Sequence, residues 1–497
     1  MKKIKLNKLI KTYLYLLLII VISSCNDDLK EELEGDLSEA TLTSEQDAIA
    51  LVDGVYNGLL AGGWDYYGYG DMARATDGVT DIFKLEPEDN LETYRWGNED
   101  IALNIWSAIY PVINRANWAL KLIDQMDDEA FGKIETKNRL LGEAAFLRGL
   151  TYFDLVGVFG GVPLKLEPTS NDSPGLPRSS KDDCYIQIEK DLNTAIANLP
   201  ESNGSPGRAT KGAAYGILAK VQLRQGKWEE AGKNIDNLIN LGKYDLYTEG
   251  SYLELFFESN RLDNEFIFSV LSMGEQYSVA SNHHIKAFTP WAYDTGWWTV
   301  GLPPSLYNSI EEGDERLEVY FDEFSPYWGG NNSAIEKWGF AIIRKFGHYN
   351  RDLTAPGTGY AAYDNYGNSQ LGVPILRYAD VLLLKADIEN ELNGPNSVAY
   401  MAINQVRNRA GLSDLPEGLS KTEFRDAILK ERAIELAAEG HRKDDLIRHN
   451  IFESTMTTYL EEQGHPVVVT PDHQLLPIPR TELNLNPNMD PNPSNSF

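Results

Sequence analysis

Three stretches of the chain mix small and large apolar residues at the spacing of a closely packed helix. They are "EAAFLRGLTYF" from Glu143, "AAYGILAKVQL" from Ala213 and "YADVLLLKADI" from Tyr378. A period of three to four residues places their apolar side chains on one face, and Ala or Gly lets a second helix approach closely. A second amphipathic pattern follows each stretch. The sequence therefore predicts helical hairpins.

Local signals support these hairpins. After the first stretch, apolar residues recur every three or four positions over residues 180–199, and Ser180 with Asp183 resembles a capping box. Thr210 is placed to cap the helix that contains Ala213. We therefore expect helices to begin at these polar residues.

The sequence also predicts the second helices of the other two hairpins. "GKWEEA", residues 226–231, is typical of the turn of a tetratricopeptide hairpin, and Val398–Arg409 forms the pattern after the third stretch. The spacing between the three copies is uneven. This indicates hairpins interrupted by insertions rather than a regular solenoid.

The largest interruption spans about residues 280–370 and shows neither helical nor strand periodicity. Eighteen of these 91 residues are aromatic, and five of the ten tryptophans lie here among Gly, Pro, Asn and Asp. A second patch of this kind, "GGWDYYGYGD", covers residues 62–71. We predict structured loops, and long irregular insertions in a compact body are usually functional.

The N-terminus has the pattern of an export signal. Lysines precede ten apolar residues, Tyr13–Ile22, which are fewer than the roughly 20 needed to span a bilayer. Ile-Ser-Ser-Cys then resembles a lipobox, whose cysteine is lipidated and becomes the mature N-terminus. We predict a lipoprotein signal peptide over 1–24, lipidation of Cys25 and an acidic surface tether over 25–40. The alternative is a signal peptide cut elsewhere, with Cys25 incidental.

The net charge limits the classes of molecule that the chain is expected to bind, and the cysteine count limits its disulfides. The formal net charge is −29, and removal of residues 1–24 with their five lysines makes it −34. Such a field repels nucleic acid, so no nucleic-acid partner is expected. The second cysteine, Cys184, has no cysteine left to pair with and is expected to be a small buried hydrophobe.

Four segments, read in order, resemble the SusD/RagB family of surface glycan-binding lipoproteins. They are "EAAFLRGLTYFDLVGVFGGVPL" (143–164), "LRYADVLLLKADIENELNG" with "AINQVRNRAGL" (376–412), "ILKERAIELAAEGHRKDDLIR" (428–448) and "LLPIPRTELNLNPN" (475–488). One departure is "MDPNP" (489–493), where the family more often has Gln-Asn-Pro. Together the four segments extend the resemblance across most of the chain.

This resemblance implies a mainly α SusD-like fold of tetratricopeptide-like helical hairpins with large irregular loop insertions. It implies one domain over 41–497, with the hairpin scaffold at about 41–279 and 371–497 and the aromatic-rich insertion at about 280–370. It also implies a non-catalytic lipoprotein on the outside of the outer membrane. This protein would capture oligosaccharides and pass them to a SusC-like TonB-dependent barrel, with no cofactor.

Aromatic side chains suit such a role because the C–H groups of a sugar face lie well on a ring's negative π-face. The predicted stacking residues, which we call the aromatic platform, are Tyr66, Tyr67, Tyr69, Trp96, Trp291, Tyr293, Trp297 and Trp298. The predicted polar helpers are Arg74, Asp77, Asp81 and Asn98. The alternative for any single aromatic is core packing, which we expect for Trp106, Trp118 and Trp228.

Glu431, Glu435 and Glu439 are spaced as an i, i+4 ladder on one helix. A metal or acid–base site is conceivable, but no zinc-hydrolase spacing accompanies them. We predict instead an ion-pair network that locks the last helices. The same structural role is expected for Arg377, Asp380, Arg407 and Arg409.

Two other functions stay open at this point. A glycoside hydrolase would use paired carboxylates, but no nucleophile elbow, P-loop or metal-ligand cluster is apparent in the sequence. A peptide- or protein-binding member of the same family is the other alternative. No metal is expected from any ligand spacing.

Overall fold

The computed structural model describes eleven stretches of the chain. They are residues 42–60, 66–67, 71–86, 91–94, 100–169, 175–202, 205–271, 299–322, 333–343, 345–346 and 371–496. Residues Ser44–Phe497 form one compact unit. The predicted signal peptide, tether and Cys25 lie outside the described residues. None of the described helices is both long and apolar enough to cross a bilayer.

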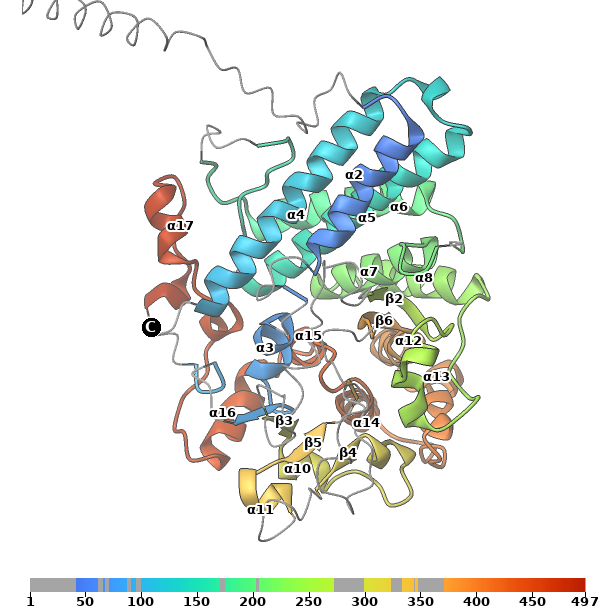
Figure 1. Cartoon of the computed structure of the whole chain (residues 1–497). Helices are drawn as coiled ribbons and strands as arrows, with labels where there is room; N and C mark the ends of the chain where they lie inside the picture. Colours follow the sequence, from blue (N-terminus) through green and yellow to red (C-terminus); the bar gives the residue numbers. More distant parts are fainter. Residues whose placement is uncertain are drawn as a thin grey trace, which may run out of the picture. The chain divides into compact units, whose positions relative to one another are not determined.

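Helices make up most of the described chain (Figure 1). The longer ones are α2 (Glu45–Gly58), α4 (Asp100–Gln125), α5 (Ile134–Phe159), α6 (Lys181–Asn198), α7 (Lys211–Arg224), α8 (Trp228–Asn240), α12 (Tyr378–Asn393), α13 (Ser397–Arg409), α14 (Lys421–Glu435) and α16 (Phe452–Glu462). The shorter ones are α3 (Asp71–Thr76), α10 (Pro304–Tyr307), α11 (Ala334–Trp338), α15 (Arg442–Arg448) and α17 (Arg480–Leu485). Helix α5 packs on α6, α7 on α8 and α12 on α13, so the predicted hairpins and the mainly α fold are confirmed.

Capping residues begin these helices as the sequence predicts. The Ser180 hydroxyl oxygen accepts the Asp183 N–H at 3.0 Å and donates to the Asp183 carboxylate at 2.6 Å. Thr210 Oγ1 accepts the Ala213 N–H at 3.2 Å and caps α7. Close packing explains the small residues in α7, because a side chain at Gly216 would collide with Leu376.

Short strands also occur within residues 280–370, so the prediction of loops alone is wrong there. Strands β1 (Lys84–Glu86), β3 (Thr299–Leu302), β5 (Ala341–Ile343) and β4 (Tyr320–Phe321) form an antiparallel sheet in that spatial order. A second pair joins β2 (Phe266–Val270) to β6 (Val373–Arg377). Strands of two to four residues are too short for an alternating pattern to appear in the sequence.

The core confirms some single-residue predictions and corrects one. Cys184 and Trp106 are buried as expected, at 0% and 4% exposed, and Trp228 packs partly buried against the same core. Trp118 is 37% exposed, and the Lys121 ammonium lies 5.5 Å from its ring centroid. The prediction of core packing for Trp118 is therefore wrong. Helix α4 packs against α2 and α5 along other faces, and periodicity alone does not say which apolar residue falls outside them.

The predicted ion-pair network is present and buried. Glu435 at the end of α14 lies 2.6 Å from Arg409, 3.1 Å from Arg377 and 3.3 Å from Arg316. Arg377 also contacts Glu439 at 2.7 Å and Glu265 at 2.5 Å. The structural role predicted for this cluster is confirmed.

The other members of the network extend it to neighbouring segments. Glu431 bonds Arg316 at 2.5 Å and Arg407 at 3.1 Å. Asp380 bonds Arg432 at 2.7 Å. Arg407 and Asp380 therefore also have the structural role predicted for them.

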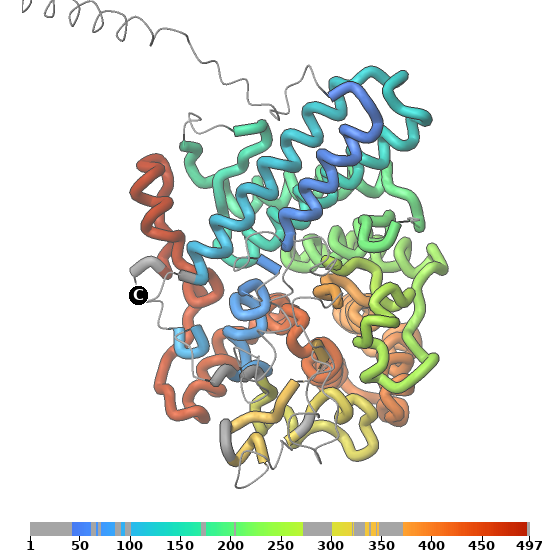
Figure 2. Tube along the Cα trace, in the orientation of Figure 1, coloured from blue at the N-terminus to red at the C-terminus, as the bar shows by residue number. Residues whose placement is uncertain are grey.

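The helix that carries the ladder is shorter than predicted. Helix α14 ends at Glu435, and Ala438 has a φ of 67°, in the left-handed region. Glu439 therefore reaches Arg377 from a tight turn and not from the next turn of a helix. We call residues 436–442 the C-terminal turn. This turn and α15 lie beside α3, although the two are far apart in sequence (Figure 2).

Neutralising Glu435 should strongly destabilise the fold. Burial alone would raise the pKa of Glu435, but Arg409, Arg377 and Arg316 outweigh it and lower this pKa to about 2. Glu435→Gln leaves these guanidiniums short of a counter-charge and should lower the free energy of unfolding by about 3–5 kcal/mol at pH 7. The measurement is urea denaturation followed by circular dichroism.

The pH dependence gives a second readout for this variant. A depressed folded-state pKa stabilises the fold above the unfolded value near 4.5 and loses that effect as pH falls toward 2. The difference between wild type and Glu435→Gln should therefore shrink between pH 5 and pH 2. Asp426→Asn, at an exposed position of the same helix, is the matched control. Equal losses in both variants would contradict a central role for Glu435.

Candidate functional site

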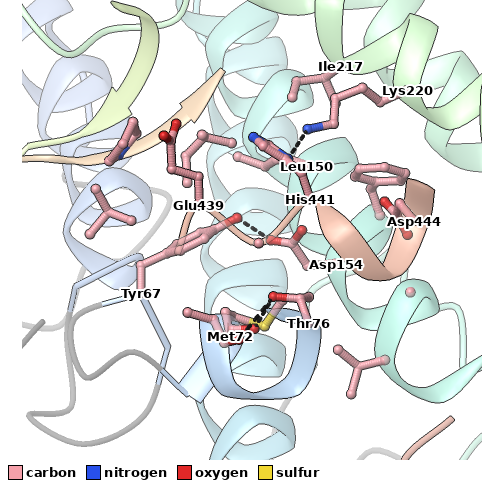
Figure 3. Close-up of a pocket in the computed structure, with 18 of the residues that line it drawn as sticks. Tyr67, Met72, Thr76, Leu150, Asp154, Ile217, Lys220, Glu439, His441 and Asp444 are labelled. Carbon is pink, nitrogen blue, oxygen red and sulfur yellow. Dashed lines mark hydrogen bonds between the residues drawn. The ribbon is translucent and has the colours of Figure 1, made fainter. Parts of the chain in front are cut away.

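A cavity lies where α3, α5, α7, β6 and the C-terminal turn meet (Figure 3). Its volume is about 70 Å³. That is room for several water molecules, whereas ligand pockets usually enclose about 300–1,000 Å³. The titratable side chains that line it include Asp154, Lys220, Arg224, Glu439, His441 and Asp444. The cavity is too small for an oligosaccharide, so its importance lies in the elements that it joins.

Two predicted platform residues meet at this cavity. The hydroxyl groups of Tyr66 and Tyr67 both donate to one carboxylate oxygen of Asp154 on α5, Tyr66 at 2.7 Å. Figure 3 shows Tyr67 pointing at Asp154. Burial raises the pKa of Asp154, and the two tyrosine hydrogen bonds oppose that shift. Tyr66 is 1% and Tyr67 7% exposed, so neither offers an open stacking face, which corrects their predicted place in the aromatic platform.

Three predicted polar helpers bond to protein groups. Asp77 is fully buried, and its carboxylate accepts the N–H groups of Gly440 and Arg442 at 2.8 and 3.1 Å. Burial raises the pKa of Asp77 to about 7, although these two hydrogen bonds oppose the shift. Asp81 forms a two-pronged pair with the Arg442 guanidinium at 2.7 and 2.8 Å. Asp77 and Asp81 therefore attach α3 and the residues after it to the C-terminal turn, rather than facing solvent as sugar ligands.

Arg74, the third helper, is partly buried on α3. Its guanidinium lies 3.1 Å from Asp71, and Asp71 in turn accepts a hydrogen bond from Asn104 of α4 at 3.2 Å. Side chains of α3 and α4 are thus held together at the first residue of α3. Tyr69 and Asn98, predicted from the segments that precede these two helices, lie outside the described residues.

Titratable groups around the cavity, including His441, already have partners within the protein. The Nδ1 of His441 lies 2.9 Å from the Lys220 ammonium, which can only donate, so Nδ1 accepts and the neutral ring carries its proton on Nε2. Burial and Lys220 lower the pKa of His441 to about 4. Asp444 is likewise paired with Arg224 at 2.7 Å. The cavity therefore lacks, among its described lining residues, an unpaired carboxylate pair of the kind that glycoside hydrolysis uses.

One group of described residues has potential metal-ligand spacing. Ligand atoms of Asp387, Glu391 and His449 lie within 4.8 Å of one another. Arg448 already bonds Asp387 at 2.9 Å, and Arg425 bonds Glu391 at 2.5 Å. A divalent ion would add positive charge beside these guanidinium groups, so the donor set fits an ion-pair cluster better than a metal.

The sheet register shows where one predicted aromatic segment joins the described structure. Glu86 at the end of β1 pairs with Thr299 at the start of β3. The chain toward Trp96 continues from Glu86, and the chain from Trp297 and Trp298 arrives at Thr299. The segment of Trp297 and Trp298 therefore joins the described structure at Thr299, opposite Glu86, whereas Trp96 lies between the described residues Tyr94 and Asp100. Trp96, Trp291, Tyr293, Trp297 and Trp298 themselves lie outside the described residues.

Tyr94, which fixes this region, was missed in the sequence, and for Arg442 only the partner was missed. Tyr94 is 4% exposed, and its hydroxyl donates to the Val79 carbonyl at 2.7 Å, which ties the chain after β1 to the 3-10 turn that follows α3. Its φ of 54° is unusual for a tyrosine. Arg442 was visible in the "EGHRKDD" motif, but its partner Asp81 lies far away in sequence. No local signal marks either contact.

Comparison with known proteins now decides the family. Residues 318–494 match the SusD family, and residues 48–223 match a family described as starch-binding and associating with the outer membrane. SusD-like protein P2 of Formosa agariphila is 28% identical over 99% of both chains. A SusD homolog of Bacteroides thetaiotaomicron has a TM-score of 0.77 at 25% identity, covering 93% of this chain and 99% of its own. The chain belongs to the SusD/RagB family.

This SusD/RagB protein is also similar to a solved laminarin-binding SusD-like protein. The TM-score is 0.71 at 26% identity, and the match covers 91% of this chain and 99% of that chain. SusD-like protein P25 of Formosa agariphila is 27% identical over 95% of this chain and 96% of its own. The family resemblance stated from the four motif segments is therefore confirmed.

A buried lysine beside the cavity gives this SusD/RagB protein a distinctive pH dependence. Lys443 on α15 is 3% exposed, and its ammonium lies 3.4 Å from the Gly157 carbonyl of α5. Burial lowers the pKa of Lys443 to about 7. Between pH 7 and about 10.5 the unfolded chain binds this proton and the folded chain does not, so the unfolding free energy should rise with pH.

Lys443→Met should remove that rise and leave the protein at least as stable at pH 6. Lys443 contributes at most about 1.4 kcal/mol per pH unit to the slope between pH 7 and 10. Urea denaturation at four pH values measures it, with Lys430→Met, an exposed position, as the control. If Lys443→Met left the slope of unfolding free energy against pH unchanged, or strongly destabilised the protein at pH 6, the conclusion that folding lowers the pKa of Lys443 would be contradicted.

Proposed function

We propose that this chain is a non-catalytic cell-surface glycan-binding lipoprotein. It captures oligosaccharides and passes them to a SusC-like TonB-dependent transporter of the outer membrane. Support comes from its relatives, which include the starch-binding protein SusD of Bacteroides thetaiotaomicron and the laminarin-binding SusD-like protein. The matched family described as starch-binding and associating with the outer membrane supports the same location.

The observation that carries this proposal is the pairing of Glu86 with Thr299. An aromatic platform needs several rings at a fixed mutual spacing, and the candidate rings come from segments far apart in sequence. The β1–β3 pair attaches the segment of Trp297 at Thr299, and Tyr94, two residues before Trp96, attaches the other segment through its hydrogen bond to the Val79 carbonyl. Asp77, two residues before Val79, holds this region against the C-terminal turn.

The lipid anchor and the orientation follow from the N-terminal pattern. Cys25 carries the lipid after residues 1–24 are removed, and the acidic tether of 25–40 separates the anchor from the folded unit. The strongly negative chain stays soluble at the cell surface. The transporter takes over the cargo there.

Binding without cleavage is favoured over hydrolysis. The carboxylates around the cavity pair with cations or hydroxyl donors, and the relatives are named as binding proteins. A peptide-binding member of the family is the remaining alternative. It would use the helical hairpins or the platform without affinity for polysaccharide.

Affinity electrophoresis of the lipid-free protein in gels that contain polysaccharides tests the platform. Trp297→Ala and Trp298→Ala should each weaken retardation about tenfold or more, because each removes a ring worth about 1.5–3 kcal/mol of apolar contact. Trp118→Ala is the matched control, since Trp118 is exposed on α4 and outside the platform.

Each outcome of this experiment discriminates between the functions. Retardation that both platform variants retain would contradict the proposed site. Release of reducing sugar by the purified protein would indicate a hydrolase. Binding of peptides with no retardation by any polysaccharide would favour the peptide-binding alternative.

A further inference from the structure

A second and larger hollow lies at the N-terminal end of α7, where Thr210 caps this helix. This groove has a volume of about 540 Å³, within the range of small-molecule sites. It is lined by residues of 201–202 and 205–210 before α7, by 242–244 after α8 and by residues of 261–271, which include β2. None of these segments carries a residue of the aromatic platform. We call it the α7 groove.

The charge of the α7 groove is opposite to that of the whole chain. Lys243, Arg261 and Arg208 line it, and Glu201 is its one acidic residue among the described lining side chains. Arg208 is already paired with Glu143 and Asp53, so its charge is largely neutralised. The net charge of the protein is −29, so a locally basic groove runs against the composition.

Two of these cations have no carboxylate partner. Lys243 is exposed, and no acidic group lies within 4.0 Å of its ammonium in the described chain. Arg261 donates to the neutral carbonyl of Glu258 at 2.9 Å, and no ion pair engages its remaining N–H groups in that same part of the structure. Most other arginines around the core are matched by acids, so these two are available to a ligand.

The start of α7 adds to this positive field. Thr210 caps the helix and lines the groove, and the first turn of α7 contains no acidic residue. A 14-residue helix places a partial positive charge at this end. The helix end by itself would not define a site, but it acts together with Lys243 and Arg261 on the same hollow.

The rest of the groove offers both apolar and hydroxyl-binding surface. Leu262 is 49% exposed and Phe266 is partly buried, and both line the groove. Asn264, Ser202 and Ser205 add exposed amide and hydroxyl groups. A sugar ring presents apolar C–H faces and hydroxyl groups together, which matches such a mixed lining.

We propose that the α7 groove binds an acidic saccharide, whose carboxylate or sulfate group pairs with Lys243 and Arg261. This inference rests on the proposed glycan-binding function and adds to it a second site with a defined charge preference. Arg261 can hold either anion through two parallel N–H donors, and Lys243 acts as a point charge. Neutral glycans bind at the platform and gain nothing from these cations.

Isothermal titration calorimetry of the purified chain tests the groove with three probes. They are tetragalacturonate for the carboxylate, an ι-carrageenan tetrasaccharide for the sulfate and maltotetraose as the neutral saccharide. Lys243→Gln and Arg261→Gln should each weaken binding of an acidic probe about tenfold, because a hydrogen bond to a charged group contributes about 1.5–3 kcal/mol. Wild-type affinity for that probe should also fall when the salt concentration rises from 20 to 200 mM, because salt screens the attraction between the cations of the groove and the anion.

The controls separate this inference from the proposed function. Lys233→Gln removes one exposed charge from α8 outside the groove and should change nothing. Binding of only one acidic probe would identify the anion, carboxylate or sulfate, that the groove recognises. Binding of both would show that the groove recognises either anion. The inference is overturned if neither acidic probe binds, if the groove variants bind them as wild type does, or if only Trp297→Ala abolishes their binding. Retardation by neutral polysaccharide in any of these cases leaves the proposed function standing.

Discussion

The described structure depends on a cluster of buried charges around Glu435 and Glu439. Burying ions is costly, and the cost is offset only when each charge has partners at hydrogen-bond distance. Here Arg377 from β6 and Arg409 from α13 converge on Glu435, and Lys345, which follows β5, donates to Glu439 at 2.7 Å. One network therefore ties the helical hairpins to both small sheets. These paired charges therefore join layers that lie far apart in sequence.

The same C-terminal turn connects this network to the candidate site. Glu439 faces Arg377 on one side, while the next residues give Asp77 two N–H donors and Asp81 a guanidinium. Helix α3 is thereby held in place, and Tyr94 extends the attachment to the chain after β1. The chain thus links a buried network and a tight turn to Tyr94, which precedes the segment of Trp96, and to the β1–β3 pair, where the segment of Trp297 and Trp298 ends.

Local patterns predicted much of this fold because its hairpins are local. The three apolar stretches and the caps Ser180 and Thr210 depend on neighbours in sequence. The spacing of Glu431 and Glu435 on one helix is also local, although their arginine partners are not. Contacts between distant segments were not predictable in this way. No residue near Tyr66 in the sequence indicates that its hydroxyl bonds Asp154 of α5, so the ring of Tyr66 seemed available for stacking. The strands of two to four residues could not be predicted for the same reason, because such short strands are defined by the distant strands with which they pair.

Hydrogen–deuterium exchange with and without a saturating neutral oligosaccharide tests the central claim most directly. If the β1–β3 pair presents one site built from distant segments, peptides from 87–99 and from 272–298 should slow together on binding. Peptides of α14 and the C-terminal turn should exchange equally slowly in both states. Protection confined to the helical hairpins α5–α8, or to one of the two segments alone, would contradict the account.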